Sequence, residues 1–375
     1  MRLIGWFIIA CCWGAASGPV AAQSATLTGQ VTDAETGQPL VGANVFLDGT
    51  MRGAATDSVG RFRLDGIPPG VYQLVASMVG YRAQRREVAL ADGEAHTVPF
   101  ALSPEPVALG EVTVEGSRDE WLDQLAVFKR HFLGAMRSAQ DCEIINPEVL
   151  SFEVNEANGA MRVIAEAPLQ IVNRTLGYEI TYVLRRFRLR GDRIDEESFG
   201  RFRELEALSA QQRQAWTEAR ERAFRGSFQH FIRSLAANRF EEEGFRVYTT
   251  AGRTYYYGPN PHLRIDGTEP VQHVRQITEA AMQPTQLVLR FEAPLLRVEY
   301  DREQEASTYL QTQLNRQTRR MSNKQLSWLA LPAGSALVDV RSGQAVRPFA
   351  PVLFGYWSWQ ERAALALPRE YEPGS

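Results

Sequence analysis

Three arginines, Arg186, Arg188 and Arg190, alternate with apolar residues in this chain. In an extended strand this spacing places three guanidinium groups on one face, where they could bind phosphates or an anionic glycan. Acidic residues that can neutralise the arginines follow closely: Asp192, Asp195, Glu196 and Glu197. The sequence therefore leaves two interpretations, an anion-binding row and a solvated, charge-balanced strand face, and the second is favoured.

A second group of candidate binding residues is aromatic. The rings cluster at Tyr255-Tyr256-Tyr257 and at Tyr356-Trp357-Ser358-Trp359. Exposed rings can stack on the faces of sugars, so Tyr256, Trp357 and Trp359 are candidates for binding a glycan. Large aromatic side chains more often belong to a hydrophobic core, and this alternative is favoured.

The histidines do not form the motif of a zinc peptidase. Zinc carboxypeptidases use a His-x-x-Glu pair and a distant histidine, because zinc needs three protein ligands and one open position for water. The residues three positions beyond the histidines are Pro99, Gly134, Arg233, Ile265 and Gln276, and none is glutamate. We therefore predict no metal and no cofactor.

Other catalytic motifs are also missing from the sequence. No serine has the flanking glycines of a nucleophile elbow, and neither Lys129 nor Lys324 follows the glycine of a phosphate-binding loop. Serine, histidine and acidic residues can still converge from distant positions. A hydrolase with dispersed catalytic residues is thus the alternative function, and a deep polar pocket with His131, His230 or His273 against carboxylates would favour it.

The composition is that of a globular protein. The 375 residues include 41 Lys+Arg and 44 Asp+Glu, for a formal net charge of −3, and 44% of the residues are hydrophobic. This length is sufficient for two domains. Because basic residues are not in excess, no nucleic-acid partner is predicted.

The N-terminus has the three-part layout of a secretory signal peptide. Met1-Arg2 precedes the apolar run from Leu3 to Ala10, and a small-residue stretch ends at Ala22. We predict that residues 1–22 are a signal peptide and that the protein is exported, either to the periplasm or to an outer-membrane-associated position. No later segment has the ~18 to 20 uninterrupted apolar residues of a membrane-spanning helix.

The cysteines allow an alternative reading of this N-terminus. Ile8-Ile9-Ala10-Cys11 also resembles the box of a bacterial lipoprotein, so a lipid anchor at Cys11 is the less favoured alternative. After cleavage at Ala22 the one cysteine left is Cys142, which cannot form an intramolecular disulfide. With no histidine nearby in sequence, Cys142 is expected to be a buried, inert thiol.

Residues 24–103 are predicted to form a β-sandwich. Alternating apolar residues, as in Leu27 to Val31 and Tyr72 to Ala76, are separated by turn residues such as Pro68-Pro69-Gly70. About seven short strands at this spacing are typical of a sandwich of under about a hundred residues. Asp33 and Asp57 lie at turns, where carboxylates more often accept backbone N–H bonds than bind calcium.

This segment also carries a family resemblance. Its residues are Gly29-Gln-Val31-Thr-Asp33, Thr36-Gly37-Gln-Pro39-Leu40-Val-Gly42-Ala43-Asn-Val45, Thr56-Asp57-Ser-Val-Gly60-Arg-Phe62 and Pro69-Gly70-Val-Tyr72. They resemble the carboxypeptidase-regulatory-like domain. The resemblance implies a prealbumin-like sandwich without catalytic residues, of the kind found beside peptidases and at the N-termini of TonB-dependent outer-membrane receptors.

Residues 104–116 are predicted to be a linker. The stretch from Leu109 to Gly116 is similar to the segment that joins this module to the plug of TonB-dependent receptors. Such a receptor continues into a barrel of roughly 22 strands of about 10 residues each. Only 259 residues follow Gly116 in this sequence, so we expect that this chain is not the transporter itself.

Residues 117–375 are predicted to form an α+β domain with a mainly antiparallel sheet. Two capping boxes, Ser117 with Glu120 and Ser209 with Gln212, each predict the start of a helical region. Alternating or apolar stretches predict strands, including Tyr178 to Leu189, Phe245 to Thr249 and Leu287 to Glu299.

This region resembles exported proteins from the Bacteroidetes lineage and its relatives, which are named only for their N-terminal regulatory-like domain. The similar segments are Phe128-Lys-Arg-His131-Phe132-Leu133-Gly134, Ile145-Asn146-Pro147-Glu148-Val149-Leu150, Ala167-Pro168-Leu169 to Leu176-Gly177-Tyr178, and Gly355-Tyr356-Trp357-Ser358-Trp359 to Leu367-Pro368-Arg369-Glu370-Tyr371. The resemblance implies no established activity.

The sequence thus predicts an exported, non-enzymatic accessory protein of the cell envelope. The sandwich would act as an adaptor, and the α+β domain would bind a ligand or a partner such as an envelope protein or a glycan. The recognised adaptor-type sandwich and the missing catalytic motifs are the reasons for this prediction.

Overall fold

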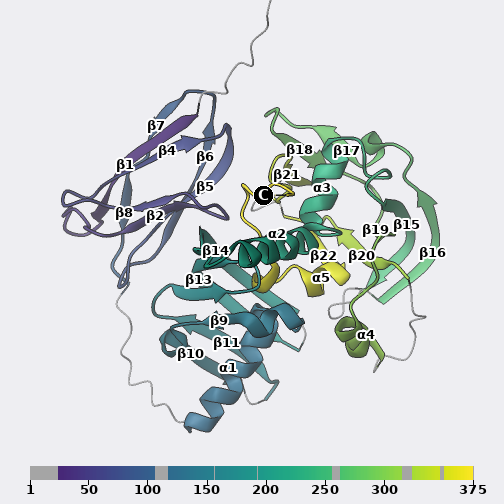
Figure 1. Ribbon diagram of the computed structural model, residues 1–375, viewed down its shortest axis with the longest axis horizontal. Helices are drawn as coiled ribbons and strands as arrows, with labels where there is room; N and C mark the ends of the chain where they lie inside the picture. The colour runs from purple at the N-terminus through teal and green to yellow at the C-terminus, as the bar shows by residue number, and fades with distance from the viewer. Residues whose placement is uncertain are drawn as a thin grey trace, which may run out of the picture.

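In a computed structural model the chain forms several β-sheets with short helices packed on them (Figure 1). The structure describes residues 24–105, 117–155, 157–191, 193–255, 262–314, 323–346 and 350–374. The predicted signal peptide and most of the predicted linker lie outside these residues. Within the described residues, no helix is long and apolar enough to cross a membrane.

The N-terminal part consists of two four-stranded sheets, which confirms the predicted all-β sandwich. The first sheet contains β1 (Ala25–Asp33), β4 (Arg61–Ile67), β7 (Ala95–Thr97) and β8 (Phe100–Leu102). The second contains β2 (Asn44–Leu47), β3 (Gly53–Ala55), β5 (Gly70–Ser77) and β6 (Gln84–Leu90). Along β4 the buried residues Phe62 and Leu64 alternate with exposed arginines, so one face of the strand packs into the core.

The turn carboxylates of the sandwich have the structural role that the sequence favoured. One oxygen of Asp33 accepts the N–H groups of Glu35 and Thr36, both at 2.8 Å, and the other accepts the hydroxyl of Tyr81. The bonds from Thr36 and Tyr81 hold the pKa of Asp33 below its ordinary value. Asp57 likewise accepts backbone N–H groups within its own turn.

The first part of the C-terminal region is a six-stranded sheet covered by two helices. Its strands are β9 (Cys142–Ile144), β10 (Leu150–Asn155), β11 (Ala160–Ala165), β12 (Leu169–Asn173), β13 (Tyr178–Arg190) and β14 (Arg193–Glu204). The helices are α1 (Arg118–Phe132) and α2 (Ala210–Phe224). We call the hydrophobic cluster between this sheet and its helices the first core.

Helix α1 begins at the capping box that the sequence predicted. Ser117 Oγ accepts the N–H of Glu120 at 3.3 Å, and the Glu120 carboxylate accepts the N–H of Ser117 at 2.8 Å. The same helix buries Phe128 and Phe132 in the first core. Cys142 is also buried there, and this burial raises the pKa of its thiol to about 12, as expected for an inert cysteine.

The second part of the C-terminal region has two antiparallel sheets and its own hydrophobic cluster, the second core. The five-stranded sheet contains β15 (Phe245–Tyr255), β16 (His262–Pro270), β19 (Leu296–Tyr300), β20 (Gln325–Ala330) and β22 (Val352–Gly355). The three-stranded sheet contains β17 (Thr278–Ala280), β18 (Gln286–Leu289) and β21 (Ala336–Asp339). The helices are α3 (Phe228–Ala236), α4 (Ser307–Leu314) and α5 (Tyr356–Gln360).

These sheets confirm the predicted α+β fold with antiparallel sheets and correct one detail. The expected strand from Leu287 to Glu299 is divided between β18 and β19, which belong to different sheets. Pro294 lies between them and has no N–H to donate, so the chain leaves one sheet before it enters the other.

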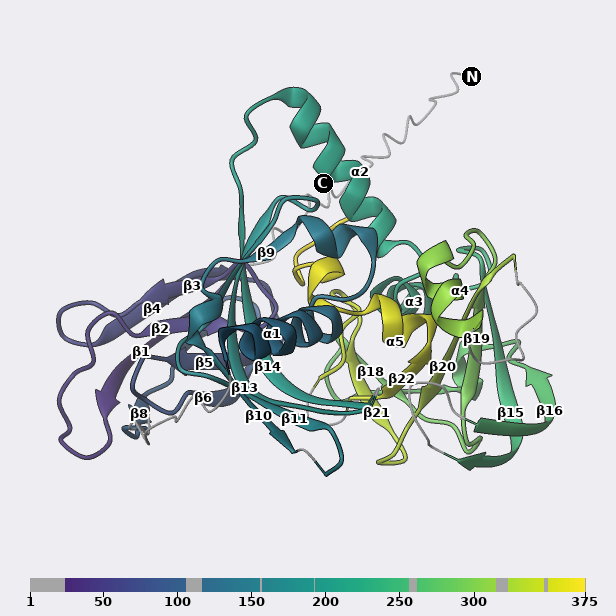
Figure 2. The ribbon, with the colours of Figure 1, turned by 90° about the horizontal axis from the view of Figure 1, so that it is seen from below.

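The C-terminal segment connects the two cores. After α5, residues 363–371 leave the second core, and Ala364, Leu367 and Tyr371 are buried in the first. The buried amide of Asn173 donates to the Ala364 carbonyl at 2.8 Å. In Figure 1 this yellow segment lies between the three parts of the molecule, and Figure 2 shows it again beneath α2.

The sandwich is attached to the first C-terminal sheet by packing and by backbone hydrogen bonds. Phe46 and Val75 from the sandwich form a buried cluster with Val183 and Phe199 from β13 and β14. The N–H of Gly49 donates to the carbonyl of β14 residue Gly200 at 2.7 Å. The sandwich therefore docks on the sheet and is not held by the linker alone.

Candidate functional site

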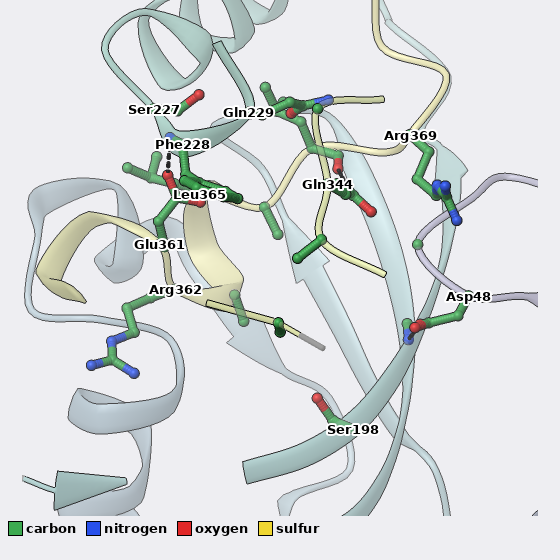
Figure 3. A pocket seen from close by; sticks show the side chains of 18 of the residues that line it. Asp48, Ser198, Ser227, Phe228, Gln229, Gln344, Glu361, Arg362, Leu365 and Arg369 are labelled. Carbon is green, nitrogen blue, oxygen red and sulfur yellow. Dashed lines mark hydrogen bonds between the residues drawn. The ribbon is translucent and has the colours of Figure 1, made fainter. Parts of the chain in front are cut away.

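A cavity of about 410 Å³ lies where the sandwich meets both parts of the C-terminal region (Figure 3). The sandwich contributes Asp48 and Tyr72 to its wall, β14 contributes Ser198, α3 contributes Gln229, and the segment after α5 contributes Glu361. This volume is within the range of small-molecule binding sites. Because its wall comes from three parts of the chain, the cavity depends on their packing together.

Glu361 is the cavity's main titratable group. One of its carboxylate oxygens accepts the N–H of Phe228, the first residue of α3, at 2.8 Å, as the dashed line in Figure 3 shows. Glu361 keeps part of its surface exposed, but desolvation by the surrounding protein raises its pKa to about 7. The Phe228 bond and the nearby Arg362 lower the pKa without outweighing burial. Near neutral pH Glu361 can thus donate as well as accept a hydrogen bond.

Two buried glutamines in the cavity wall lack hydrogen-bond partners among the described residues. They are Gln229, through its Nε2 donor, and Gln360, through its Oε1 acceptor, and the two residues are 7% and 5% exposed. Buried polar atoms are nearly always paired, because each unpaired one costs about 1–3 kcal/mol. Both residues line the cavity, so a rotation of either side chain would bring its unpaired atom within reach of water or a ligand there.

Other polar side chains around the cavity have protein partners. Ser198 Oγ donates to the Glu196 carboxylate at 2.6 Å, and Gln344 Nε2 donates to a main-chain carbonyl at 3.3 Å. The guanidinium of Arg369 lies 3.5 Å from the carboxylate of Asp339. These groups position one another, whereas the two glutamines leave bonding capacity for a guest.

The predicted arginine row lies on the β13–β14 hairpin and does not line this cavity. Arg186 pairs with Asp195 at 3.1 Å and with Glu197 at 3.2 Å. Arg188 and Arg190 are exposed, and Arg188 lies opposite Asp195 in the strand register. This arrangement supports the charge-balanced strand face that the sequence favoured.

The predicted aromatic candidates do not come together in an open platform. Trp357 is 2% exposed in the second core, and its Nε1 donates to a main-chain carbonyl at 2.7 Å. Its ring is therefore not available to stack on a sugar. Trp359 is half-buried and packs against Tyr309 and Tyr356, with ring centroids 5.5 and 5.3 Å apart. Tyr256 lies outside the described residues.

The histidines of the alternative hydrolase hypothesis lie away from the cavity. His230 borders a second pocket, where its Nε2 is 3.6 Å from the Glu243 carboxylate and its Nδ1 accepts the N–H of Gly226 at 3.1 Å. Burial lowers the pKa of His230 to about 4. The neutral ring thus has its acceptor nitrogen occupied and cannot take a proton from a nucleophile in this arrangement. His131 donates to a carbonyl of its own helix, and His273 caps a short 3₁₀ helix.

Residues 27–114 match the CarboxypepD_reg-like domain family. The match confirms the regulatory-like domain that the sequence motifs indicated. This domain supplies the sandwich side of the cavity, including Asp48, whose carboxylate accepts the N–H of Gly200 at 2.8 Å. Comparison with curated proteins gives no match.

Solved structures that match a part of this chain include pilus proteins and dioxygenases. The group B streptococcus pilus 2b backbone protein is 18% identical, with a TM-score of 0.19, over 22% of this chain and 42% of its own. Hydroxyquinol 1,2-dioxygenase from Pseudomonas putida is 12% identical, with a TM-score of 0.19, over 22% of this chain and 57% of its own. This chain therefore spans about half the length of these two proteins or less.

Sequence reasoning did not find the glutamines or Glu361. Gln229, Gln360 and Glu361 belong to no motif, and glutamine is normally a surface residue. Within the described residues, no group of three His, Cys, Asp or Glu side chains could hold a metal ion. The regulatory-like domain and its neighbours thus line a cavity with polar side chains in its wall.

Proposed function

We propose that this chain is an exported, non-enzymatic accessory protein of the cell envelope that binds a ligand in the central cavity. The observation that carries the proposal is the cavity itself, with the unpaired amide groups of Gln229 and Gln360 in its wall. A protein that leaves two buried polar groups without partners loses stability, and a ligand that pairs them restores it.

The regulatory-like domain acts in this proposal as an adaptor that is coupled to the ligand site. Its residues Asp48 and Gly49 both bond to Gly200 and also line the cavity. Occupancy of the cavity would therefore stabilise the docked position of the domain. Through this coupling, ligand binding in the cavity would change how firmly the domain is docked, and a partner in the envelope could recognise that change.

A hydrolase remains the second candidate, and one contact favours it. Ser198 Oγ donates to Glu196 at 2.6 Å at the cavity wall, and a carboxylate in this position can act as a general base toward a serine. Against this function, no described histidine lines the cavity to pass a proton on to a leaving group.

The test uses the purified, full-length mature chain and a fractionated extract of the native envelope. We expect a fraction that raises the Tm of the wild type but not of Leu365→Trp, because a larger side chain at position 365 fills the cavity. Mass spectrometry should recover the active compound unchanged. Conversion to a product by the wild type, lost in Ser198→Ala, would establish the hydrolase instead.

Export is a separate part of the proposal and needs its own measurement. Cell fractionation should place the protein outside the cytoplasm, with a mature N-terminus just after Ala22. Incorporation of palmitate that is lost in Cys11→Ser would show the lipoprotein alternative. A protein retained in the cytoplasm with Met1 intact would contradict export.

A further inference from the structure

We propose that the ligand of the central cavity is a short, uncharged stretch of extended polypeptide, recognised through its amide groups. This inference rests on the proposed binding function and names its ligand class. Three features of the cavity support it: the unpaired glutamine atoms, an open strand edge and a wall with little net charge.

The unpaired atoms of the glutamines match the two halves of a peptide bond. The unpaired atom of Gln229 is a donor, Nε2, and that of Gln360 is an acceptor, Oε1. Both atoms are buried, so each side chain must rotate toward the cavity to reach a ligand. A peptide amide has one carbonyl acceptor and one N–H donor, so a chain of amides can satisfy both glutamines. A ligand with acceptors alone, such as a phosphate, would leave Gln360 without a partner.

The open edge of β14 adds main-chain groups at the same wall. The carbonyl of Gly200 accepts the N–H of Gly49, and the N–H of Gly200 donates to the Asp48 carboxylate. Both main-chain groups of Gly200 therefore point away from β13. The direction of the main-chain N–H and C=O groups alternates along a strand, so those of Ser198 and Glu196 point to the same edge as those of Gly200. Both line the cavity, and no described main-chain group pairs with them on that edge. An extended peptide could add to this edge.

The charges around the cavity favour an uncharged segment. Glu196 and Arg362 attract each other, and Glu361 is only partly ionised near neutral pH because burial raises its pKa. The balance is close to neutral, so a charged ligand would enter with no matching opposite charge. Apolar side chains complete the wall and suit the side chains of a peptide: Val71, Phe132, Phe202, Leu353, Leu365 and Leu367.

A sugar is a poorer match for this wall. Sugars bind proteins largely by stacking on exposed aromatic faces. The ring of Tyr72 already lies under Arg369, 5.0 Å from the guanidinium carbon. The ring of Tyr182 packs edge-on against Phe132, with centroids 5.4 Å apart. The aromatic rings of the cavity are therefore engaged with protein.

The experiment compares three probes on the full mature chain by saturation-transfer NMR and thermal shift. The probes are the blocked peptide N-acetyl-Ala-Val-Ala-amide, its depsipeptide with an ester in place of the central amide, and maltotriose. We expect the peptide to bind and to raise the Tm. The depsipeptide should bind about tenfold more weakly, because one N–H donor is lost, and maltotriose should not bind.

The variants Gln229→Leu and Gln360→Leu identify the site. Each should weaken peptide binding about tenfold without lowering the Tm of the free protein, because each removes an unpaired polar atom of similar shape. Gln211→Leu, at an exposed position on α2, is the matched control and should bind as the wild type does.

The outcomes separate this inference from the proposed function. If maltotriose binds and depends on Gln229 and Gln360 while the peptide does not bind, the peptide class is wrong and the binding function stands. If no probe and no envelope fraction binds, and the leucine variants are merely more stable, the cavity holds only water and both proposals fail. Equal binding of peptide and depsipeptide would also overturn the amide recognition.

Discussion

The central cavity and the His230 pocket are both polar and partly buried, but they differ in how completely their groups are paired. In the His230 pocket the arginines have acidic or main-chain partners: Arg225 with Glu221 at 2.6 Å, Arg239 with Glu243 at 2.6 Å and Arg233 with the Tyr371 carbonyl at 2.7 Å. In the central cavity Gln229 Nε2 and Gln360 Oε1 have no partner among the described residues. One buried atom of the His230 pocket, Arg233 Nε, also lacks a partner, but the arginines there are held by ion pairs or main-chain bonds. The comparison teaches that polarity alone does not mark a binding site, since side chains held in this way stabilise the fold.

One short connection joins the two pockets. Between α2 and α3, the Gly226 N–H donates to His230, and the Gly226 carbonyl accepts Nε1 of Trp357 at 2.7 Å. Two residues later the N–H of Phe228 donates to Glu361. Gly226 has a φ of +72°, which disfavours side chains other than hydrogen. The connection therefore lies between the His230 pocket and the central cavity and forms hydrogen bonds with residues of both.

The largest expected effect comes from removing the side chain that anchors this connection. Trp357→Ala should lower the free energy of unfolding by about 3–5 kcal/mol, because it leaves a cavity in the second core and an unpaired Gly226 carbonyl. Urea denaturation measures the loss. Trp359→Ala is the control, and its half-buried ring should matter much less. Equal losses would contradict the assignment of Trp357 to the core and Trp359 to the periphery.

Removing a hydrogen-bond partner from the His230 pocket should have the next largest effect. His230→Leu leaves the buried N–H of Gly226 without an acceptor, which should cost about 1–3 kcal/mol of stability. The same denaturation experiment measures it. A variant as stable as the wild type would mean that this pocket is not held together by its hydrogen bonds, and the contrast with the cavity would disappear.

The two titratable groups should make stability depend on pH in opposite directions. Glu361 has a pKa of about 7 when folded, above the ordinary 4.5, so its contribution falls as pH rises from 4.5 to 7. His230 has a folded pKa of about 4, below the ordinary 6.5, so its contribution rises from pH 4 to 6.5. Each group should change the free energy of unfolding by up to about 1 kcal/mol per pH unit. The change from Glu361 should be smaller, because water in the cavity screens its charge.

Single variants separate these slopes. Glu361→Gln should gain stability relative to the wild type as pH rises through its window. In His230→Leu the gain between pH 4 and 6.5 should be missing. Unfolding free energies at several pH values provide the measurement. Parallel pH profiles for the wild type and Glu361→Gln would show that Glu361 titrates as it does in the unfolded chain.

The smallest expected effect is a gain in stability from the cavity itself. Gln360→Leu should leave the free energy of unfolding unchanged or raise it by up to about 1 kcal/mol, because it removes an unpaired buried acceptor. Gln211→Leu, on the exposed face of α2, should change stability little. A clear loss of stability in Gln360→Leu would indicate that its amide has a structural partner, such as an ordered water.

Much of the fold follows from local sequence patterns. The alternation of Phe62 and Leu64 with arginines places β4, and the capping box at Ser117 places the start of α1, because both signals act over a few residues. The split of the predicted strand between Leu287 and Glu299 was missed. Strand patterns give no information on which sheet a segment joins, since that choice depends on partners far away in the sequence.

The sequence by itself determined the regulatory-like sandwich and the antiparallel character of the rest, because turn residues and side-chain periodicity are local. Tertiary structure alone decided the candidate site. Gln229 and Gln360 are more than a hundred positions apart, and both line the cavity only because the C-terminal segment passes between the cores. Whether a buried polar group finds a partner depends on such long-range contacts, which no local sequence pattern records.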